Sequence, residues 1–401
     1  MKKFRIISLL GIRPDLIRMF KLINLLDIGQ SKNNYEHLFM HTGQHFDYEL
    51  DGIFYKELGV RLPDYNMEVG KTLKKGGHNT GFAYQMGLLF ERTAEMVEKF
   101  KPDAVMYLGD TNTVLSSVVV ARMGVPVIHL EAGGRSYDWR MPEEINRITI
   151  DHLSDVLYSY VPRYKSILLS EGIPEFRIKV IGNIIHDAIE NFIYKADQTN
   201  ILSKLKLQSK KFVLTTLHRE ENTNSKQILL DKFSDLIKLA NEMKVVLPLM
   251  PRVRNNLKQF GILNQVLHSN VIITEPLGFF EFLKLEKEAK VIISDSGTVQ
   301  EESLILGTPC HISRLSTERP ETIEAGATIL SNKNLYNNTK KALTLKNNWN
   351  RWVLNPTKKS PSEVVYNDLM EKINNNFFKN SRKFNYTKQN KIMKQAYGIF
   401  K

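Results

Sequence analysis

Nine short apolar runs recur along the chain, and each is followed by a polar turn and then by a stretch with a helical pattern. Such an alternation is typical of parallel strands joined by helices, because helices cover both faces of a parallel sheet. The sequence therefore predicts a parallel α/β fold. The nine runs lie within residues 4–11, 36–44, 103–111, 125–133, 211–220, 245–251, 270–278, 290–297 and 308–313.

The series of runs is interrupted once, by a polar segment between Ile189 and Lys211. With 401 residues and 42% hydrophobic content, the chain favours two domains over one. We predict two doubly wound domains that face each other across a cleft: residues 1–188, an inter-domain segment 189–210, and residues 211–375. The first run is not followed by Gly-x-Gly-x-x-Gly, so we expect no dinucleotide cofactor.

The last part of the chain, residues 376–401, is a basic tail. It carries seven Lys or Arg residues and no acid, which is over half of the formal net charge of +13. A charge excess confined to a tail indicates a solvated extension rather than a nucleic-acid groove, so we expect no nucleic-acid partner. Aromatic residues lie among the basic ones, and this pattern leaves contact with an anionic surface or a nucleic acid as the alternative.

The cysteine content and the hydropathy of the chain allow a prediction of the cellular compartment in which it works. Cys310 is the single cysteine, so neither an intramolecular disulfide nor a thiolate metal cluster is possible, and a reducing cytoplasm fits best. The first apolar run contains Arg5 and is followed by Gly-Ile-Arg-Pro, which favours a first strand over a signal peptide. No stretch approaches the ~20 apolar residues that a transmembrane helix needs. The acids lie among Arg and His residues without His-Glu-x-x-His, so we predict no metal site.

The segment from Val291 to Pro309 has the pattern of a phosphate-binding turn: an apolar run, then Asp-Ser-Gly-Thr, then a helical pattern. Backbone N–H groups that open a helix after a parallel strand attract anions. Glu302 lies six residues after Ser296, roughly 9 Å along a helix at about 1.5 Å per residue, which is about the reach from a diphosphate to a ribose. The segment is therefore a diphosphate cradle or an ordinary capped surface helix.

Charged and polar side chains follow nearly every predicted strand. Ligands of doubly wound sheets bind outside the carboxyl ends of the strands, so these residues are expected to share one site. The presence of both charge signs indicates acid–base chemistry beside an anionic ligand. The residues are Arg13, Gln44, His45, Asp110, Thr111, Glu131, Arg135, His218, Arg219, Glu220, Ser296 and Gly297.

Three acids are candidates for the chemistry. Asp110 stands between a strand and a helix, so it is either a helix N-cap or a catalytic group. Glu131 ends a strand before Ala-Gly-Gly, which leaves the backbone open to close approach and suits packing poorly. Glu143 and Glu144 follow a proline that suits the first turn of a helix, and this helix start accounts for one of the two acids.

His218 closes a strand and is followed by Arg219. A lone histidine is often a satisfied polar residue, but a His-Arg pair at a strand end can clamp a phosphate.

Nine ordered motifs over about 320 residues resemble the non-hydrolysing UDP-N-acetylglucosamine 2-epimerases. The motifs are GIRPD (11–15), TGQH (42–45), GDT (109–111), HLEAGGR (129–135), PEEINR (142–147), GN (182–183), TLHREEN (216–222), SDSGTVQEES (294–303) and STERPETIEAG (316–326).

The resemblance implies two Rossmann-like domains of the glycosyltransferase B type, a UDP-sugar substrate, no cofactor and usually a homodimer. In this family, C2 of the sugar is inverted by anti elimination of UDP to a 2-acetamidoglucal, followed by re-addition of UDP to the other face. One group takes the C2 proton, another delivers a proton from the opposite side, and cations stabilise the departing diphosphate.

The resemblance also implies roles for matching residues, without assigning which acid is the base. Residues that were identified only because they follow predicted strands are assigned to substrate binding. The catalytic candidates are Asp110, Glu131, Glu143 and His218, the last also a diphosphate ligand. The substrate-binding candidates are Arg13 for the diphosphate, Ser296 and Gly297 for the phosphates, Glu302 for the ribose, Phe282 near the uracil, Arg319, Arg18, Gln44, His45, Arg135 and Arg219.

Several positions depart from the usual family pattern. The first motif reads Gly-Ile-Arg-Pro-Asp where Gly-Thr-Arg-Pro-Glu is usual, and Arg18 replaces a usual lysine, which keeps the charge but not the geometry. Met250 stands where a histidine is common, which puts regulation by a second UDP-sugar in doubt. Ser-Asp-Ser-Gly-Thr at 294–298 resembles the branch that acts on modified sugars.

The resulting hypothesis is the interconversion of UDP-N-acetylglucosamine and UDP-N-acetylmannosamine for a surface polysaccharide such as a capsule or O antigen. One alternative keeps the chemistry on a modified sugar, either a 2-acetamido-2,6-dideoxy-talose/fucosamine or a 2,3-diacetamido-glucuronate. A second is a hydrolysing epimerase that releases N-acetylmannosamine. A third is a glycosyltransferase of the same fold, which needs no acid to remove a C2 proton.

Overall fold

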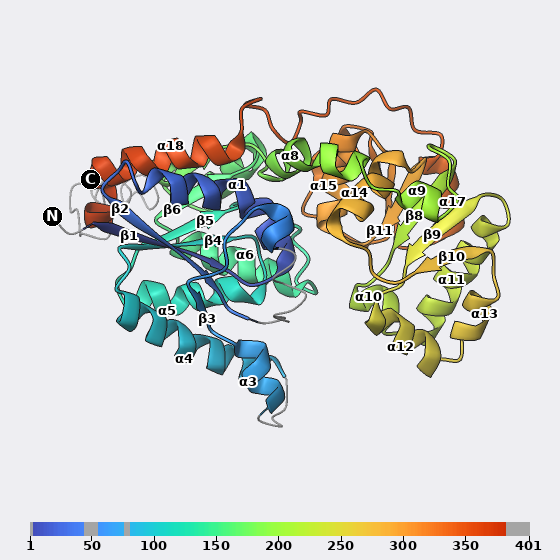
Figure 1. The fold of residues 1–401 in the computed structure, drawn as a ribbon, viewed down its shortest axis with the longest axis horizontal. Coiled ribbons are helices and arrows are strands. Elements are labelled where there is room, and N and C mark those ends of the chain that lie inside the picture. Colours follow the sequence, from blue (N-terminus) through green and yellow to red (C-terminus); the bar gives the residue numbers. More distant parts are fainter. Residues whose placement is uncertain (1–2, 44–54, 76–80, 382–401) are drawn as a thin grey trace, which may run out of the picture. The chain divides into compact units, whose positions relative to one another are not determined.

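The computed structural model describes residues 3–43, 55–75 and 81–381. Contacts between residues divide the chain into two compact units (Figure 1). The first unit comprises Met1–Ala188 and Thr357–Lys401, and the second comprises Ile189–Pro356. Each unit is a parallel sheet covered by helices on both faces, as strands that are apolar on both sides require.

The sheet of the first unit has the strand order β3-β2-β1-β4-β5-β6-β7, and its paired strands are parallel. Its strands are β1 (Phe4–Leu10), β2 (Tyr35–His41), β3 (Tyr65–Asn66), β4 (Ala104–Leu108), β5 (Val127–Leu130), β6 (Val156–Ser159) and β7 (Ile178–Val180). Its helices are α1 (Arg13–Gly29), α3 (Val69–Lys75), α4 (Phe82–Phe100), α5 (Ser117–Arg122), α6 (Pro142–Leu153), α7 (Pro162–Ser170), α18 (Pro361–Asn374) and α19 (Phe377–Ser381), with short 3₁₀ turns at Asn112–Ser116 and Glu175–Arg177.

The sheet of the second unit has the order β10-β9-β8-β11-β12-β13, again with parallel pairs. Its strands are β8 (Phe212–Thr216), β9 (Lys244–Pro248), β10 (Val271–Thr274), β11 (Val291–Ser294), β12 (Cys310–Ile312) and β13 (Thr328–Leu330). Its helices are α9 (Ile201–Lys204), α10 (Glu220–Thr223), α11 (Lys226–Ala240), α12 (Pro251–Gln259), α13 (Leu263–Leu267), α14 (Phe279–Glu288), α15 (Gly297–Leu306), α16 (Pro320–Glu324) and α17 (Leu335–Ala342), while α8 (Ile185–Asp197) spans the boundary.

The core of the second unit has two layers, one on each face of the sheet. Alternate residues of β11 divide between them: Val291 and Ile293 pack with Phe233 of α11, whereas Ile292 packs with Val299 of α15. This division follows from the two-residue period of a strand. Figure 1 shows α14 and α15 together on one side of this sheet. Because α15 follows β11 directly and packs on this sheet, its first residues lie beside the carboxyl end of that strand.

These sheets confirm the predicted parallel α/β fold with two doubly wound domains, since all nine predicted runs contain a strand. Within the described residues, four further strands occur that were not predicted. Three of them, β3, β7 and β13, are two or three residues long and lie at sheet edges, where one side of the strand has no neighbouring strand in the sheet. The fourth, β6, is a four-residue strand inside the sheet. Strands of two to four residues are too short to show the residue pattern from which a strand is predicted.

The division of the chain differs from the expected boundary at residue 375, because α18 belongs to the first unit. Helix α18 packs along α1 (Figure 1). The buried Asp187 carboxylate accepts hydrogen bonds from Ser360 Oγ at 2.6 Å and Ser362 N at 2.8 Å. Tyr158 in β6 donates to Asp368 of α18 at 2.7 Å. These contacts join the chain end to the first sheet.

The expected inter-domain segment 189–210 is not a separate linker. Residues Ile201 and Leu207 are buried in the same apolar cluster as Phe212 and Ile292, so the segment helps to form the core of the second unit. Near the chain end, Phe378 is buried and packs against Phe4 with the two rings tilted, and the rest of the basic tail from residue 382 lies outside the described residues. A search of the described helices finds none with the length and hydropathy that crossing a membrane requires.

Candidate active site

Four of the predicted polar residues follow strands at the carboxyl ends of the two sheets, beside the points where the strand order reverses. In the first sheet the reversal lies between β1 and β4, which Arg13 and Asp110 follow. In the second it lies between β8 and β11, which His218 and Ser296 follow. Ligands of doubly wound sheets bind at such reversals. The topology thus places a candidate binding surface on each unit.

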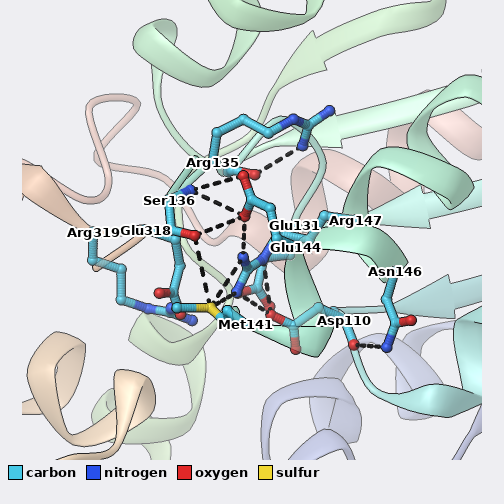
Figure 2. Close-up of polar contacts among 12 residues, drawn as sticks. Asp110, Glu131, Arg135, Ser136, Met141, Glu144, Asn146, Arg147, Glu318 and Arg319 are labelled. Carbon is cyan, nitrogen blue, oxygen red and sulfur yellow. Dashed lines mark hydrogen bonds and ion pairs between the residues drawn. The ribbon is translucent and has the colours of Figure 1, made fainter. Parts of the chain in front are cut away.

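On the first unit, Arg147 of α6 holds two acids (Figure 2). Its Nε and Nη2 donate to Asp110 Oδ2 at 2.9 and 2.6 Å, and its Nη1 donates to Glu144 Oε2 at 2.6 Å. Side chains of Arg147 and Glu144 are buried, whereas that of Asp110 stays 21% exposed. Two donors on one carboxylate fix its orientation. Asp110 is therefore a rigidly held acid that solvent still reaches.

Glu131 is the second acid on this unit, and it lies directly after β5 with a φ of 75°. A positive φ is rare for a residue other than glycine and is kept only where the surroundings enforce it. Arg18 of α1 supplies that restraint: it pairs with Glu131 and, through Nη2, with Asp15 at 2.9 Å. A Cβ atom on Gly109 would lie 3.1 Å from Arg18 Nη2 and 3.4 Å from Glu131 Oε2, so the bare glycine makes room for this pair.

Glu143 and Glu144, adjacent in the first turn of α6, have different environments. The Glu144 carboxylate is buried and accepts hydrogen bonds from the backbone N–H groups of Ser136 and Tyr137 and from Ser136 Oγ, at 2.8 to 3.1 Å. It therefore pins the loop before α6. Glu143 is partly exposed and takes no part in those bonds. Glu144 is the structural acid of the two, and Glu143 remains the candidate for chemistry.

Arg135, expected to bind substrate, is instead enclosed by carboxylates. Its Nη1 donates to Asp151 at 2.7 Å, and its Nε and Nη2 donate to Glu171 at 2.9 and 2.7 Å, with the guanidinium fully buried. Burial alone would lower the pKa of Arg135, but the two carboxylates outweigh it and raise the pKa. Asp151 also bonds His129 and the Gly133 backbone N–H. Arg135 thus supports the loop that follows Glu131.

On the second unit, the buried carboxylate of Asp295 organises the end of β8. It accepts the backbone N–H groups of His218 and Arg219 at 2.9 and 3.0 Å, and it pairs with His218 Nδ1 at 3.0 Å. Burial alone would raise the pKa of Asp295, but His218, the Asn222 amide and the Arg219 N–H outweigh it and lower the pKa to about 2. The His218 side chain is 45% exposed, so Asp295 fixes an imidazole that faces outward.

Helix α15 begins beside the guanidinium of Arg319. Ser296 is its N-cap residue and Gly297 its first residue. A Cβ atom on Gly297 would lie 2.7 Å from Arg319 Nη1, so a larger residue at this position would require the guanidinium to shift. Arg319 is buried, donates from Nε to Glu301 at 2.6 Å and also pairs with Glu318. The N–H groups at a helix start attract anions, and Arg319 lies beside them with its charge balanced by Glu301 and Glu318.

The remaining predicted residues are spread over the fold. Arg13 is exposed at the start of α1, and Arg219 is partly exposed before α10. Arg18 is engaged with two acids of its own unit. Glu302 is 6% exposed on α15, and Phe282 packs against the apolar core beneath the second sheet. Gln44 and His45 lie outside the described residues.

The partners of these acids were not predicted from the sequence. Glu144, Arg147 and Asp151 lie at spacings of three and four residues, so they share one face of α6. This spacing was a signal for a buried charged face. Asp295 gave no such signal, because an acid after a strand also caps helices. The described residues contain no group of three or more His, Cys, Asp or Glu side chains suited to a metal ion.

Comparisons with known proteins agree on one family. A family model described as UDP-N-acetylglucosamine 2-epimerase matches residues 29–358. The chain is 38% identical over 352 residues to a UDP-N-acetylglucosamine 2-epimerase of Methanocaldococcus jannaschii, which covers 85% of this chain and 93% of the relative. It is 32% identical over 335 residues to the UDP-2,3-diacetamido-2,3-dideoxy-D-glucuronate 2-epimerase of Pseudomonas aeruginosa, which covers 81% of this chain and 88% of the relative.

A solved structure of the Methanocaldococcus jannaschii UDP-GlcNAc 2-epimerase, in complex with UDP-GlcNAc and UDP, is similar in fold. The two superpose with a TM-score of 0.81 at 35% sequence identity, over 92% of this chain and all of the other. Because the structural similarity extends over nearly the full length of both chains, it includes both units of this chain.

Proposed function

The chain belongs to the UDP-N-acetylglucosamine 2-epimerase family, and on that premise we propose that it inverts C2 of a UDP-N-acetylhexosamine. In its standard form the reaction interconverts UDP-N-acetylglucosamine and UDP-N-acetylmannosamine. The observation that carries the proposal is the set of acids oriented by arginines at the carboxyl end of the first sheet. In the same chain, the second sheet presents His218 and the start of α15 at its strand reversal.

The chemistry requires an acid and a base on opposite faces of the sugar. In the elimination, a carboxylate takes the C2 proton, its electron pair forms the C1–C2 double bond, and the C1–oxygen bond breaks to release UDP. Re-addition of UDP with a proton from the other face gives the epimer. We propose Asp110, Glu131 and Glu143 for these proton transfers, because they are the acids at this edge with solvent access or strained, enforced geometry.

The diphosphate needs positive groups that stabilise it as it departs. We propose His218 and the start of α15, with Ser296, Gly297 and Arg319, for this task, together with Arg13 on the first unit. Asp295 supports the assignment of His218 because it holds one ring nitrogen and leaves the other for a phosphate oxygen. The first domain would then supply acid–base groups and the second would bind UDP, with Glu302 at the ribose.

Replacing Gly297 with alanine is expected to weaken UDP binding by about tenfold or more. The added methyl group would lie 2.7 Å from Arg319 Nη1 and 2.9 Å from its Cζ, so the guanidinium must shift, at about 1–3 kcal/mol for overpacking. Isothermal titration calorimetry with UDP measures the change. Gly278→Ala is the matched control, since a Cβ there meets nothing within 4 Å. Equal affinity of the two variants would contradict the close packing at α15.

The test of the proposed function is turnover. The purified chain, incubated with UDP-N-acetylglucosamine and followed by proton NMR, should produce a UDP-linked manno sugar. Free N-acetylmannosamine with UDP would instead indicate a hydrolysing epimerase. Transfer of the sugar to an acceptor without inversion at C2 would indicate a glycosyltransferase.

A modified UDP-sugar is the second candidate substrate. Two observations favour it: the Ser-Asp-Ser-Gly-Thr sequence at 294–298, and 32% identity to a relative that acts on a diacetamido-glucuronate. The same NMR assay with UDP-2,3-diacetamido-2,3-dideoxy-glucuronate and with UDP-2-acetamido-2,6-dideoxyhexoses compares the candidates by kcat/KM. We also propose that the enzyme acts as a homodimer in the cytoplasm and supplies surface polysaccharide synthesis. Light scattering measures the first of these.

A further inference from the structure

A buried lysine that the proposed reaction does not use lies on α11, beside the carboxyl end of the second sheet. Lys232 is 4% exposed. Its Nζ donates to Ser313 Oγ at 2.7 Å, directly after β12, and to Oδ1 and O of Asn332 at 2.7 and 3.1 Å, just beyond β13. All three acceptors are neutral, so within the described residues no carboxylate forms an ion pair with this ammonium. A buried charge of this kind costs stability and is typical of functional sites.

The three acceptors indicate that Lys232 carries its proton. An ammonium group has three hydrogens to donate, whereas a neutral amine has two. Burial lowers the pKa of Lys232 to about 8, and the nearby carboxylates of Asp295, Glu221, Asp235 and Asp231 oppose this lowering. The ammonium form therefore predominates at neutral pH.

A chain of buried polar contacts joins Lys232 to His218. Ser313, which accepts from Lys232 through its hydroxyl oxygen, also accepts from Asn222 Nδ2 through its carbonyl oxygen at 2.9 Å. The same amide group donates to Asp295 Oδ2 at 2.9 Å. Asp295 Oδ1 in turn pairs with His218 Nδ1 at 3.0 Å. The three intermediate residues are 0% exposed, so each one depends on its neighbours rather than on solvent for these contacts.

We propose that Lys232 is a positioning residue: its buried ammonium anchors Ser313 and, through Asn222 and Asp295, fixes the imidazole of His218 for the diphosphate of UDP. The inference rests on the proposed function, in which His218 binds the diphosphate. One amide group of Asn222 serves both Ser313 and Asp295, so a shift of Ser313 would misalign the donor that holds Asp295. The orientation of the imidazole depends on that carboxylate.

A double-mutant cycle with His218 tests the positioning role. Isothermal titration calorimetry measures UDP affinity for the unmodified chain, Lys232→Met, His218→Ala and the double variant. Lys232→Met alone should weaken UDP binding by about tenfold, which lies within the range of couplings inside one hydrogen-bond network. In the His218→Ala background the same change should cost less than about twofold, because the side chain that Lys232 positions is gone. A full tenfold loss in that background would overturn the proposal.

Uridine separates the positioning role from general damage to the fold. It has no phosphate for His218 to bind, so Lys232→Met should leave its affinity, measured by NMR titration, unchanged. Equal weakening of uridine and UDP would overturn the proposal, because a merely structural role predicts that result. If Lys232→Met does not fold, Lys232→Gln, which keeps a polar group at this buried position, is carried through the same cycle with the same expectation.

Lys238→Met is the matched control, since Lys238 is exposed on the same helix and lies over the ring of Tyr336, 4.1 Å from its centroid. It removes the same charge from α11 and should leave the affinity for UDP unchanged. A loss equal to that of Lys232→Met would contradict a role of the buried position. Failure of the unmodified chain to bind UDP at all would contradict the proposed function itself. UDP binding that Lys232→Met leaves unchanged would contradict only the role of Lys232.

Discussion

Replacing Glu131 with glutamine is expected to lower kcat by about 10²- to 10⁴-fold, the usual contribution of a general acid or base. Glutamine has the same shape and its amide oxygen can still accept from Arg18, so the pair that holds this side chain against α1 remains possible. The loss then reports on proton transfer. Steady-state kinetics measures kcat, and calorimetry with UDP should give an affinity close to that of the unmodified chain.

A control for this variant removes an arginine-paired glutamate from the opposite edge of the same sheet. Glu36 at the start of β2 pairs with Arg5 at 2.7 Å, and the two residues are register partners in neighbouring strands. Glu36→Gln should leave kcat unchanged, because it lies at the amino ends of the strands. Unchanged turnover in Glu131→Gln would remove Glu131 from the mechanism and leave the proton transfers to Asp110 and Glu143.

Replacing Asp151 with asparagine is expected to destabilise the first unit by about 3–5 kcal/mol, the range for removing one partner of a buried ion pair. Asp151 is buried and bonds His129 Nδ1 at 2.7 Å, Arg135 Nη1 at 2.7 Å and Gly133 N at 3.0 Å. Asparagine is uncharged, so the buried Arg135 guanidinium would lose one of the two carboxylates that balance its charge. Urea unfolding followed by fluorescence measures the shift.

Two further measurements accompany this variant. Glu171→Gln removes the outer, partly exposed partner of Arg135 and should cost less than Asp151→Asn. Burial alone would raise the pKa of Asp151, but His129 and Arg135 outweigh it and lower the pKa. The stability from a lowered pKa is present above the unfolded value and lost as pH falls through the folded value, so acid should destabilise the unmodified chain more than Asp151→Asn. An equal response to acid would contradict the ion pair.

The sequence predicted the parts of the fold that depend on local pattern. Strands buried on both faces, such as β4 and β11, are continuous apolar runs, so their positions could be found without knowledge of their neighbours. Helix α18 could not be assigned to the correct unit, because the contacts that join it to the first sheet connect Asp187 with Ser362, 175 residues apart. Sequence patterns carry no information on pairs so distant.

The residues of the candidate site divide in the same way, into those that local sequence predicts and those that depend on contacts between distant elements. Residues after strands, such as Asp110 and His218, follow from the rule for doubly wound sheets. The partners that orient them, Arg147 and Asp295, depend on how separate elements meet, as the sequence separation of 37 between Asp110 and Arg147 illustrates.

The most direct test of the epimerase proposal is the fate of the C2 hydrogen in D₂O. The unmodified chain is incubated with UDP-N-acetylglucosamine, or with whichever UDP-sugar the turnover assay identifies, and both epimers are examined by NMR. Elimination and re-addition through solvent-exchanging acids should replace the C2 proton by deuterium in the product and, as the reaction reverses, in the recovered substrate. An inverted product that keeps its C2 proton would contradict removal of that proton by the acids of the first unit.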